Sequence, residues 1–469
     1  MTPTDLSFTA ANNSPMLVVD PTNGRFVVAA HRVDAPVFGC GLQVSSNGGR
    51  DWVGVDPVPT LPEGAERCYA PEVAFDRKGT LYYLFIGLMG LGNEPMGVFL
   101  TTSTNRGRSF STPWKILDEQ NYQVRLAVDH GLGDRGRMYL TWLHSAQDPP
   151  LGGLPDTPNP ILSAFSDDGG RTFSTPVPVS DPGRRRVVGP SLVLGRDHAV
   201  HVAYYDLEDD ARDYQGLEGP AWDGTWSLVV TTSLDRGARF GEGVVAADSI
   251  LPPGRVMLIY TMAPAGFGAG PGDELYLAWP DAREGERGDV FLARSGDGGR
   301  SWGRPQRVND DGGGRVVTQE LPRVGVAPGG RIDVAWLDRR NDPDDIRGDV
   351  YYTTSSDGGR TWAANVRVTT EPSDSRIGQR YRIPSAAGLV ERGSRLAVLS
   401  RAGEVLLAWP DTRNGSIGTN QQDVFSAVVE VGGDGGGGGV VWLGVAAGLV
   451  LAVVVAGGLT FARKRRRVA

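Results

Sequence analysis

One eight-residue pattern, S-x-D/N-x-G-x-x-W/F, occurs six times in this chain and constrains its fold more than any other feature. The copies begin 58 to 67 residues apart, at Ser45, Ser103, Ser166, Ser233, Ser295 and Ser355. A period of this length indicates one supersecondary unit repeated along the chain, because each unit needs its neighbours to bury its apolar face. We refer to each copy as an Asp-box turn.

The residues of the pattern predict a tight hairpin. A carboxylate or amide at the third position can accept hydrogen bonds from the backbone N–H groups of its own turn. Glycine at the fifth position permits positive φ, and the aromatic residue at the eighth opens the next strand. We therefore interpret the third-position residues as structural and not catalytic: Asn47, Asn105, Asp168, Asp235, Asp297 and Asp357.

A second repeat, apolar-x-apolar-Ala-aromatic, precedes each Asp-box turn, as in Leu275–Trp279, and its aromatic residues are expected in the core. With a strand before it and two after it, each repeat has four strands, which is typical of a β-propeller blade. The sequence thus predicts an all-β, seven-bladed propeller; a six-bladed propeller with a partial cap is the alternative. The seventh repeat has no Asp-box turn, so Asp5–Thr9 is expected to pair with Asp423–Val429 and close the ring.

Composition limits the class of protein. The net charge of −8 argues against nucleic acid as a partner. Only two cysteines occur, so the chain is not a disulfide scaffold. Cys40 and Cys68 are expected on the same face of adjacent blades, either joined in a disulfide or as two buried thiols.

The C-terminal region predicts attachment to a membrane. Residues 1–430 form the propeller, and residues 431–439 are a glycine-rich linker. Residues 440–461 carry no charge and are long enough to span a bilayer, and the tail 462–469 follows with five consecutive basic residues. We expect a single-pass protein of the cell membrane with an extracellular propeller and a cytoplasmic C-terminus. The first residues lack the pattern of a signal peptide.

Candidate ligand-binding residues lie on the face opposite the Asp-box turns, where the first strands begin and the second strands end. Arginines there would suit a carboxylated sugar, and a tyrosine beside a glutamate is able to act as a nucleophile. The strand entries supply Tyr69, Glu72, Tyr122, Arg125, Glu320, Arg323, Tyr381 and Arg382. Two long loops, at 148–159 and 206–225, are rich in polar residues, and the second is able to hold calcium; no other cofactor is expected.

Three blades share an Asp-x-Arg segment after the second strand, followed by an aspartate that opens the third. The segments are Asp281–Arg283, Asp338–Arg340 and Asp411–Arg413, and the later aspartates are Asp289, Asp349 and Asp423. Their repetition predicts structural ion pairs across each hairpin.

The Asp-box turns resemble those of the sialidase superfamily of Asp-box propellers, across nearly all of residues 5–430. Tyr381-Arg382-Ile383-Pro384 is similar to the family's RIP motif, whose arginine belongs to a triad that holds the sialic-acid carboxylate. The resemblance implies that Arg413 is a further triad arginine and that Asp423 is an acid/base residue.

Two functions follow from these patterns. The first is a binding or scaffolding module that engages a glycan or an extracellular protein through the face opposite the Asp-box turns. The second is a glycoside hydrolase, an exo-α-sialidase acting on sialylated glycans, with Arg125, Arg323, Glu72 and Tyr381 added to the candidate catalytic set.

Overall fold

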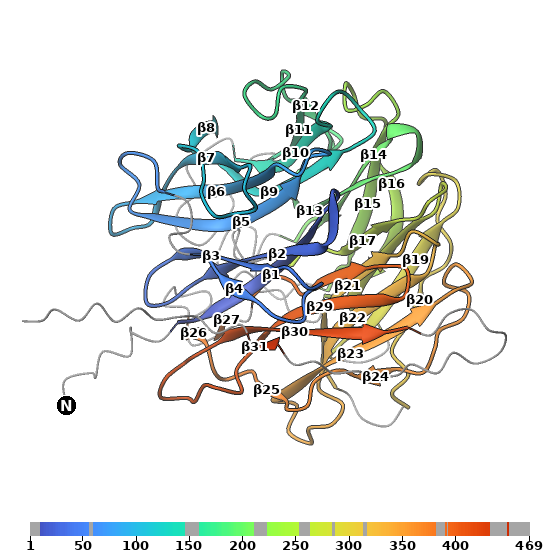
Figure 1. Ribbon diagram of the computed structural model, residues 1–469. Helices are drawn as coiled ribbons and strands as arrows, with labels where there is room; N and C mark the ends of the chain where they lie inside the picture. The colour runs from blue at the N-terminus through green and yellow to red at the C-terminus, as the bar shows by residue number, and fades with distance from the viewer. Residues whose placement is uncertain are drawn as a thin grey trace, which may run out of the picture.

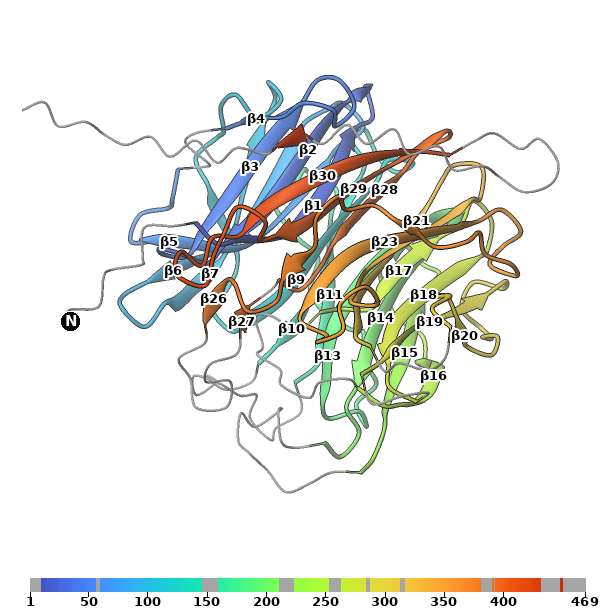
Figure 2. The same cartoon turned by 90° about the horizontal axis from the view of Figure 1, so that it is seen from below.

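The chain folds into seven sheets of four consecutive strands (Figures 1 and 2). The structure is a computed structural model, and it describes residues 10–55, 60–145, 159–210, 223–252, 263–283, 287–312, 317–380, 390–391, 393–431 and 448–449. The first strand of each sheet contacts the first strands of both neighbouring sheets, so these strands form a closed ring around the axis. The predicted all-β, seven-bladed propeller is confirmed, and the six-bladed alternative is wrong.

The first three blades run from Asn12 to Pro178. Blade 1 consists of β1 (Asn12–Asp20), β2 (Asn23–Val33), β3 (Gly39–Ser45) and β4 (Val53–Gly54). Blade 2 consists of β5 (Arg67–Phe75), β6 (Leu81–Met89), β7 (Glu94–Ser103) and β8 (Trp114–Leu117). Blade 3 consists of β9 (Asn121–Asp129), β10 (Arg137–His144), β11 (Ile161–Ser166) and β12 (Val177–Pro178).

The next three blades continue in the same order. Blade 4 consists of β13 (Val187–Leu194), the 3₁₀ turn η2 (Arg196–His198), β14 (Val200–Asp206), β15 (Trp226–Ser233) and β16 (Val244–Ile250). Blade 5 consists of β17 (Gly266–Ala269), β18 (Leu275–Asp281), β19 (Asp289–Ser295) and β20 (Gln306–Arg307). Blade 6 consists of β21 (Gln319–Val326), β22 (Ile332–Asp338), β23 (Arg347–Ser355) and β24 (Val366–Arg367), and β25 (Ser373–Asp374) also pairs with β23.

Blade 7 lies beside blade 1, and a short hairpin precedes it. The hairpin consists of β26 (Gln379–Arg380) and β27 (Val390–Glu391). The blade consists of β28 (Ala397–Ser400), β29 (Glu404–Asp411), β30 (Asp423–Glu430) and β31 (Gly448–Leu449). In Figure 1 the red strands of this blade meet the blue strands of blade 1, so the two ends of the propeller chain complete the ring.

All six Asp-box turns follow the third strand of a blade and use one hydrogen-bond pattern. In blade 6, the Oδ1 atom of Asp357 accepts from the backbone N–H of Thr361 at 3.0 Å, as the sequence predicted. The hydroxyl of Ser355 accepts from the N–H of Gly359 at 2.9 Å and donates to Asp357. Gly359 has φ of +78°, the conformation for which glycine was expected. The serine's part in the pattern was not anticipated.

The second-strand aromatic residues lie in the core, where the sequence placed them. Trp142, Trp279 and Trp336 are almost completely buried, and so are Phe85 and Tyr204. Since the strands of each sheet face a neighbouring blade on both sides, these residues fill the space between blades. They are therefore not available as platforms for a sugar ring.

The Asp-x-Arg segments form ion pairs, but with a different partner from the one expected. Arg413 pairs with Asp411 two residues earlier, with Nη2 2.7 Å from Oδ2, and not with Asp423 across the hairpin. The same carboxylate accepts the indole N–H of Trp409 at 2.9 Å. Blades 5 and 6 repeat this Trp–Asp–Arg cluster with Trp279, Asp281 and Arg283 and with Trp336, Asp338 and Arg340. A buried carboxylate with a guanidinium this near in sequence needs no partner across the hairpin.

The ring closes where the start of blade 1 meets the start of β30. Ala11 and Gln422 form a parallel bridge, and Asn12 N–H donates to the carbonyl of Gln422 at 2.7 Å. The predicted closing strand Asp5–Thr9 lies outside the described residues, and the strand that pairs with β30 is β31, two residues of the C-terminal region. Within the part of the chain that the structure describes, no helix is long and apolar enough to cross a membrane. The predicted span at 440–461 lies outside that part except for Gly448 and Leu449.

Cys40 and Cys68 form a disulfide between blades 1 and 2. Their Cα atoms are 5.8 Å apart, and the bond joins β3 to β5. Of the two alternatives that the sequence left open, the structure has the bonded pair and not two thiols.

Candidate functional site

Seven residues, one from each first strand, occupy an equivalent position around the axis. The strand register defines this set. In each blade we start from the second-strand residue that pairs with the last residue of the third strand, or with its equivalent. The second-strand residue three positions later pairs with the first-strand residue of the set. We call these the central positions: Met16, Glu72, Arg125, Ser191, Gly266, Arg323 and Ala397. Three of the seven are charged, and these are three residues that the sequence proposed for the site.

A bulge in the first strand precedes the central position in blades 1, 2, 3, 4 and 6. One residue of each bulge has positive φ, and four of these residues are not glycine: Ser14, Ala70, Gln123 and Leu321. A left-handed conformation at such residues costs free energy and persists only where the surroundings enforce it. Bulges commonly redirect side chains next to binding sites, and here they repeat around the axis.

Glu72 is the carboxylate at which two arginines meet. Arg125 Nη1 lies 3.3 Å from Glu72 Oε1, and Arg395 Nη1 hydrogen-bonds to the same oxygen. The Glu72 side chain is 3% exposed, and those of Arg125 and Arg395 are 16% and 13% exposed. The three side chains come from blades 2, 3 and 7, so the contact joins blades that are distant in the sequence.

Backbone carbonyls hold the arginines in place. Arg395 donates from Nε to Ser14 O at 3.3 Å and from Nη2 to Pro71 O at 3.1 Å, both in bulges. Arg125 Nε donates to Pro190 O at 3.0 Å in blade 4. The bulged strands therefore turn carbonyl oxygens toward the guanidinium groups, and each arginine bridges blades.

Arg323 brings a third positive charge to the same region. Its Nη1 donates to Pro264 O at 3.0 Å and its Nη2 to Ser394 O at 3.2 Å. Burial, and then the charges of Arg395 and Arg125, lower the pKa of Arg323 to about 9. Burial lowers the pKa of Arg125 to about 10 against the opposing effect of Glu72. We call Glu72, Arg125, Arg323 and Arg395 the central cluster; it has three positive charges and one negative charge.

A small cavity of about 30 Å³ opens beside the central cluster. Arg125, Arg395 and Glu72 line it, together with Arg32 and Tyr69. Arg32 forms a buried ion pair with Asp34, with Nε 2.8 Å from Oδ1, and its guanidinium lies 5.1 Å from the centre of the Tyr69 ring. This volume suits one small polar group, such as part of a carboxylate, and not a sugar ring.

The structure brings together only part of the candidate set. Glu72, Arg125 and Arg323 belong to the central cluster, whereas Arg413 lies in the Trp–Asp–Arg cluster of blade 7. Asp423 accepts from Asn414 and Gln421 and not from Arg413. Neither Arg413 nor Asp423 contacts the central cluster: Arg413 pairs with Asp411 in a cluster that blades 5 and 6 repeat, and Asp423 lies beside two amide side chains. Tyr381 and Arg382 lie outside the described residues.

Arg395 is a member of the central cluster that the sequence did not indicate. It stands two residues before the central position of blade 7, in a segment with no recognisable first-strand pattern. In the sequence, Arg395 is an isolated arginine near the start of a blade, and nothing distinguishes it from the other arginines of the chain.

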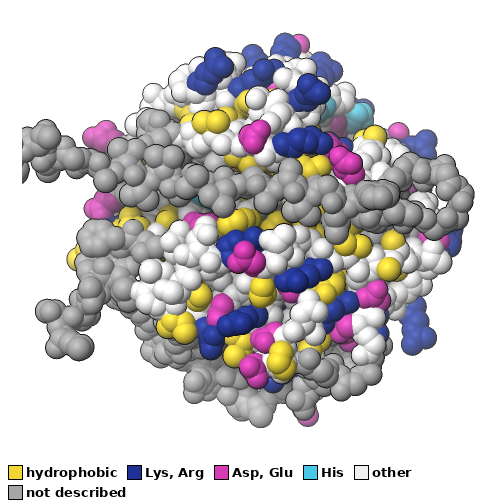
Figure 3. Space-filling model, turned by 60° about the horizontal axis from the view of Figure 1, so that its bottom comes forward, with side chains coloured by type: hydrophobic (Ala, Val, Ile, Leu, Met, Phe, Trp, Pro, Cys, Tyr) yellow, Lys and Arg dark blue, Asp and Glu magenta, His cyan; other side chains and the backbone are white. Residues whose placement is uncertain are grey.

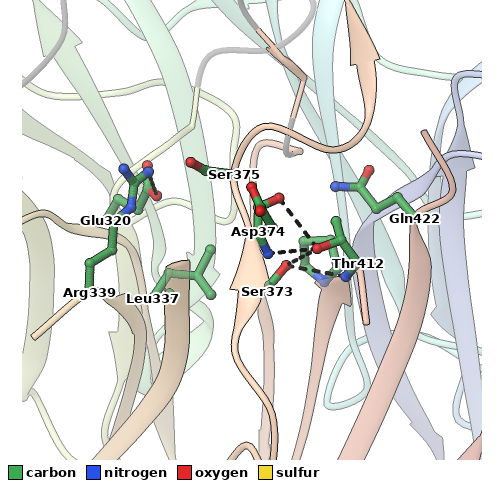
Figure 4. A pocket seen from close by; sticks show the side chains of 10 residues that line it. Glu320, Leu337, Arg339, Ser373, Asp374, Ser375, Thr412 and Gln422 are labelled. Atoms are coloured by element: carbon green, nitrogen blue, oxygen red, sulfur yellow. Dashed lines mark hydrogen bonds and ion pairs between the residues drawn. The ribbon is translucent and has the colours of Figure 1, made fainter. Parts of the chain in front are cut away.

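Glu320 lines a second cavity, which lies between blades 6 and 7 and has a volume of about 20 Å³ (Figure 4). Arg339 Nη2 lies 2.9 Å from Glu320 Oε1, and burial raises the pKa of Glu320 despite this pairing. On the other side of the cavity the Thr412 hydroxyl accepts from the backbone N–H of Asp374 at 2.7 Å. In Figure 4, Glu320, Leu337 and Arg339 lie on one side of the cavity and Asp374, Thr412 and Gln422 on the other, and the small volume leaves little room for a ligand.

The face of the molecule seen in Figure 3 carries both signs of charge. In Figure 3 basic and acidic side chains are interspersed on the visible face wherever it is described. Among the described residues, no group of three or more histidine, cysteine, aspartate or glutamate side chains is placed to hold a metal ion. The polar loops at 148–159 and 206–225 fall largely outside those residues, so the calcium expectation stays a prediction.

Comparison with known proteins shows the fold. No family model and no curated protein sequence matches the chain. An ulvan lyase of polysaccharide lyase family PL25, in complex with -[GlcA(1-4)Rha3S]-, aligns with a TM-score of 0.52 at 12% identity, over 93% of this chain and 97% of that one. The Hadza microbial sialidase Hz136 aligns with a TM-score of 0.46 at 16% identity, over 83% and 72%. An α-L-arabinanase of Penicillium chrysogenum aligns with a TM-score of 0.45 at 14% identity, over 79% and 96%.

Proposed function

We propose that the protein binds an acidic glycan over the central cluster, with a carboxylate or sulfate group of the glycan received by the arginines. The observation that carries this proposal is the charge of the cluster. Three guanidinium groups lie in a cluster whose single carboxylate, Glu72, pairs with two of them, and burial with mutual repulsion lowers the pKa of Arg125 and Arg323. An anionic ligand relieves that repulsion, because buried charge is costly unless it is compensated.

The overall likeness to an ulvan lyase supports a polysaccharide as the ligand class. That protein is described in complex with a saccharide that carries glucuronic acid and sulfate. Guanidinium groups bind carboxylate and sulfate oxygens through paired hydrogen bonds, so the central cluster has suitable donors for either group.

The test is binding of acidic oligosaccharides to variants of the central cluster. Calorimetric titration would use an ulvan tetrasaccharide and sialyllactose as probes, with wild type, Arg323→Gln and Arg395→Gln. Since a hydrogen bond to a charged group contributes about 1.5–3 kcal/mol, each variant is expected to lose affinity about ten- to hundred-fold. Arg413→Gln is the matched control, because it removes a partly buried arginine from the Trp–Asp–Arg cluster of blade 7.

Two results separate binding from loss of folding. Each variant should keep the far-ultraviolet circular dichroism of the wild type at the temperature of the titration. Equal affinity in Arg323→Gln, Arg395→Gln and wild type would remove the basis of the proposal.

Glycoside hydrolysis is a second candidate, and one observation favours it. Tyr69 and Glu72 line the same cavity as Arg125 and Arg395, so a sugar whose carboxylate enters this cavity would have a phenol and a carboxylate beside it. In that case the wild type should release the fluorophore from a fluorogenic α-sialoside, and Tyr69→Phe should not. Binding without turnover would contradict hydrolysis and leave glycan binding as the only one of the two functions.

Attachment to a membrane belongs to the same proposal. The uncharged residues 440–461 and the basic residues 462–469 support a single-pass protein with the propeller outside the cell. An extracellular glycan or glycoprotein is the partner that fits this location.

A further inference from the structure

A large groove lies on the opposite face of the propeller, between the Asp-box turns of blades 5 and 6. Its volume is about 770 Å³, within the range of small-molecule binding sites. Tyr276, Arg294 and Trp302 line it from blade 5, and Asp357 and Arg360 from blade 6. No residue of the central cluster lines this groove, so it is a separate site.

Three hydrogen-bond donors surround one point in the groove, above Gly358. Arg294 Nη1, Arg360 Nη1 and Tyr276 Oη lie 3.7, 3.8 and 3.8 Å from the position that a Cβ atom of residue 358 would take. Arg294 Nη1 donates to Gly358 O at 3.2 Å, and Arg360 Nη1 donates to Asp357 O at 2.6 Å. Within the described chain neither guanidinium is paired with a carboxylate, and the Tyr276 hydroxyl has no hydrogen-bond partner.

Two other joints between neighbouring blades carry a tyrosine at the same strand position, and both are closed. Tyr139 of blade 3 occupies the same strand position as Tyr276, and its hydroxyl donates to Arg236 O of the next Asp-box turn at 3.2 Å. Arg137 at that joint donates to the same carbonyl and also forms a bidentate pair with Asp167, with both N–O distances 2.7 Å. The joint between blades 3 and 4 therefore satisfies groups that the joint between blades 5 and 6 leaves available.

A similar closed joint lies between blades 2 and 3. Tyr82 is at the same strand position, and its hydroxyl lies 3.4 Å from Asp76 Oδ2. Arg135 pairs with that carboxylate, with Nη1 3.0 Å from Oδ2. Here a carboxylate of the protein occupies the place between tyrosine and arginine, which indicates what kind of group the open joint can receive.

The carboxylates of the groove are used within their own turns. Asp357 accepts from the backbone N–H groups of Arg360 and Thr361 and from two hydroxyls, which hold the pKa of its carboxyl well below the usual range. Glu274 accepts from Gly272 N–H at 2.9 Å. Burial and the nearby Glu274 raise the pKa of Tyr276, so its hydroxyl keeps its proton and can donate.

We propose that this groove is a second glycan-binding site, in which Arg294, Arg360 and Tyr276 bind the carboxylate or sulfate group of an acidic saccharide. The missing carboxylate is thus supplied by the ligand, as Asp76 and Asp167 supply it within the protein at the closed joints. Trp302 lines the groove with an aromatic side chain against which a sugar ring can pack. This site does not depend on the proposed function of the central cluster.

The experiment measures the number of binding sites and their affinities by calorimetric titration at low and at physiological salt concentration. The probes are a galacturonate trisaccharide, a sulfated trisaccharide and inorganic sulfate, which distinguish the carboxylate, the sulfate ester and the free ion. The variants are the double substitution Arg294→Ala with Arg360→Ala, and Tyr276→Phe, which removes only the hydroxyl. Arg137→Ala is the matched control from the closed joint between blades 3 and 4.

The double variant should lose the groove site, with affinity for the preferred saccharide reduced at least thirty-fold, and Tyr276→Phe should reduce it several-fold. Arg137→Ala should bind as the wild type does. Because Arg294 and Arg360 are exposed and each donates through its guanidinium to only one backbone carbonyl, the double variant should keep its fold and midpoint of unfolding.

Unchanged stoichiometry and affinity in the double variant, or an equal loss in Arg137→Ala, would overturn the proposal. If Arg323→Gln abolishes all binding and the double variant leaves binding unchanged, the central cluster is the only binding site. If the double variant abolishes all binding and Arg323→Gln leaves it unchanged, the groove is the only binding site.

Discussion

At the scale of single residues, the central cluster depends on one carboxylate. Glu72 is the acceptor for Arg125 and Arg395 and is almost fully buried. Removing one partner of a buried pair leaves charge without compensation, which typically costs about 3–5 kcal/mol. We therefore expect Glu72→Gln to lower the free energy of unfolding by about that amount.

The same variant should respond to anions more than the wild type does. Urea unfolding in sulfate and in chloride at equal ionic strength measures this, since sulfate at the cluster would replace the lost negative charge. An unfolding midpoint equal to that of the wild type would show that Glu72 does not compensate the arginines.

His31 makes stability depend on pH. It is buried in blade 1, between Gln43 and Asn12, and burial lowers its pKa to about 4. In the unfolded chain the imidazole binds a proton near pH 6.5, so between these values the unfolded state holds more protons. Stability is therefore complete above about pH 6.5 and falls toward pH 4, by up to about 1.4 kcal/mol for each pH unit.

Replacing the imidazole with a group that does not titrate tests this reasoning. In His31→Gln, the loss of stability between pH 7 and pH 5 in urea titrations should be smaller than in the wild type. His201, whose pKa burial also lowers to about 4, should retain its own contribution in that variant. An identical dependence on pH in both proteins would contradict the assignment to His31.

At the scale of elements, the disulfide joins β3 to β5 and so fixes blade 1 against blade 2. It closes a loop with a sequence separation of 28 residues. In the chain-entropy description a loop of this length contributes roughly 3–4 kcal/mol. Cys40→Ser with Cys68→Ser should lower the free energy of unfolding by about that amount, measured by denaturant titration. Alkylation of both cysteines in denatured, unreduced wild type would show instead that the thiols are free.

Strands and turns were predictable because they repeat, whereas the bulges were not. The Asp-box turns identify themselves through Asp357 and Gly359 and their counterparts, since each residue has a local hydrogen-bonding or conformational reason. The bulges place Ala70, Gln123 and Leu321 at positive φ, and such residues give no local signal. Arg125 and Arg323 were found because they stand in recognisable strands; Arg395, which belongs to an irregular segment, was not.

At the scale of the whole molecule, the closed ring explains how residues distant in the sequence form one site. The contact between Asn12 and Gln422 joins the first and last blades, and Arg395 of blade 7 reaches Glu72 of blade 2. The number of blades could be predicted from the period of the repeats. The closing contacts could not, because they depend on side chains at the two ends of the propeller that share no pattern.

Equivalent backbone positions with unequal side chains give the propeller a direction about its axis. The central positions of blades 3 and 6 carry Arg125 and Arg323, and those of the two blades between them carry Ser191 and Gly266. A linear chain lying across the axis would therefore meet cations at two separated points of the rim and small side chains along the arc between them. The protein then sets the direction in which the bound chain lies about the propeller axis, as well as its depth along that axis. Exchanging residues among equivalent positions would therefore rotate the bound chain without altering the backbone of the propeller.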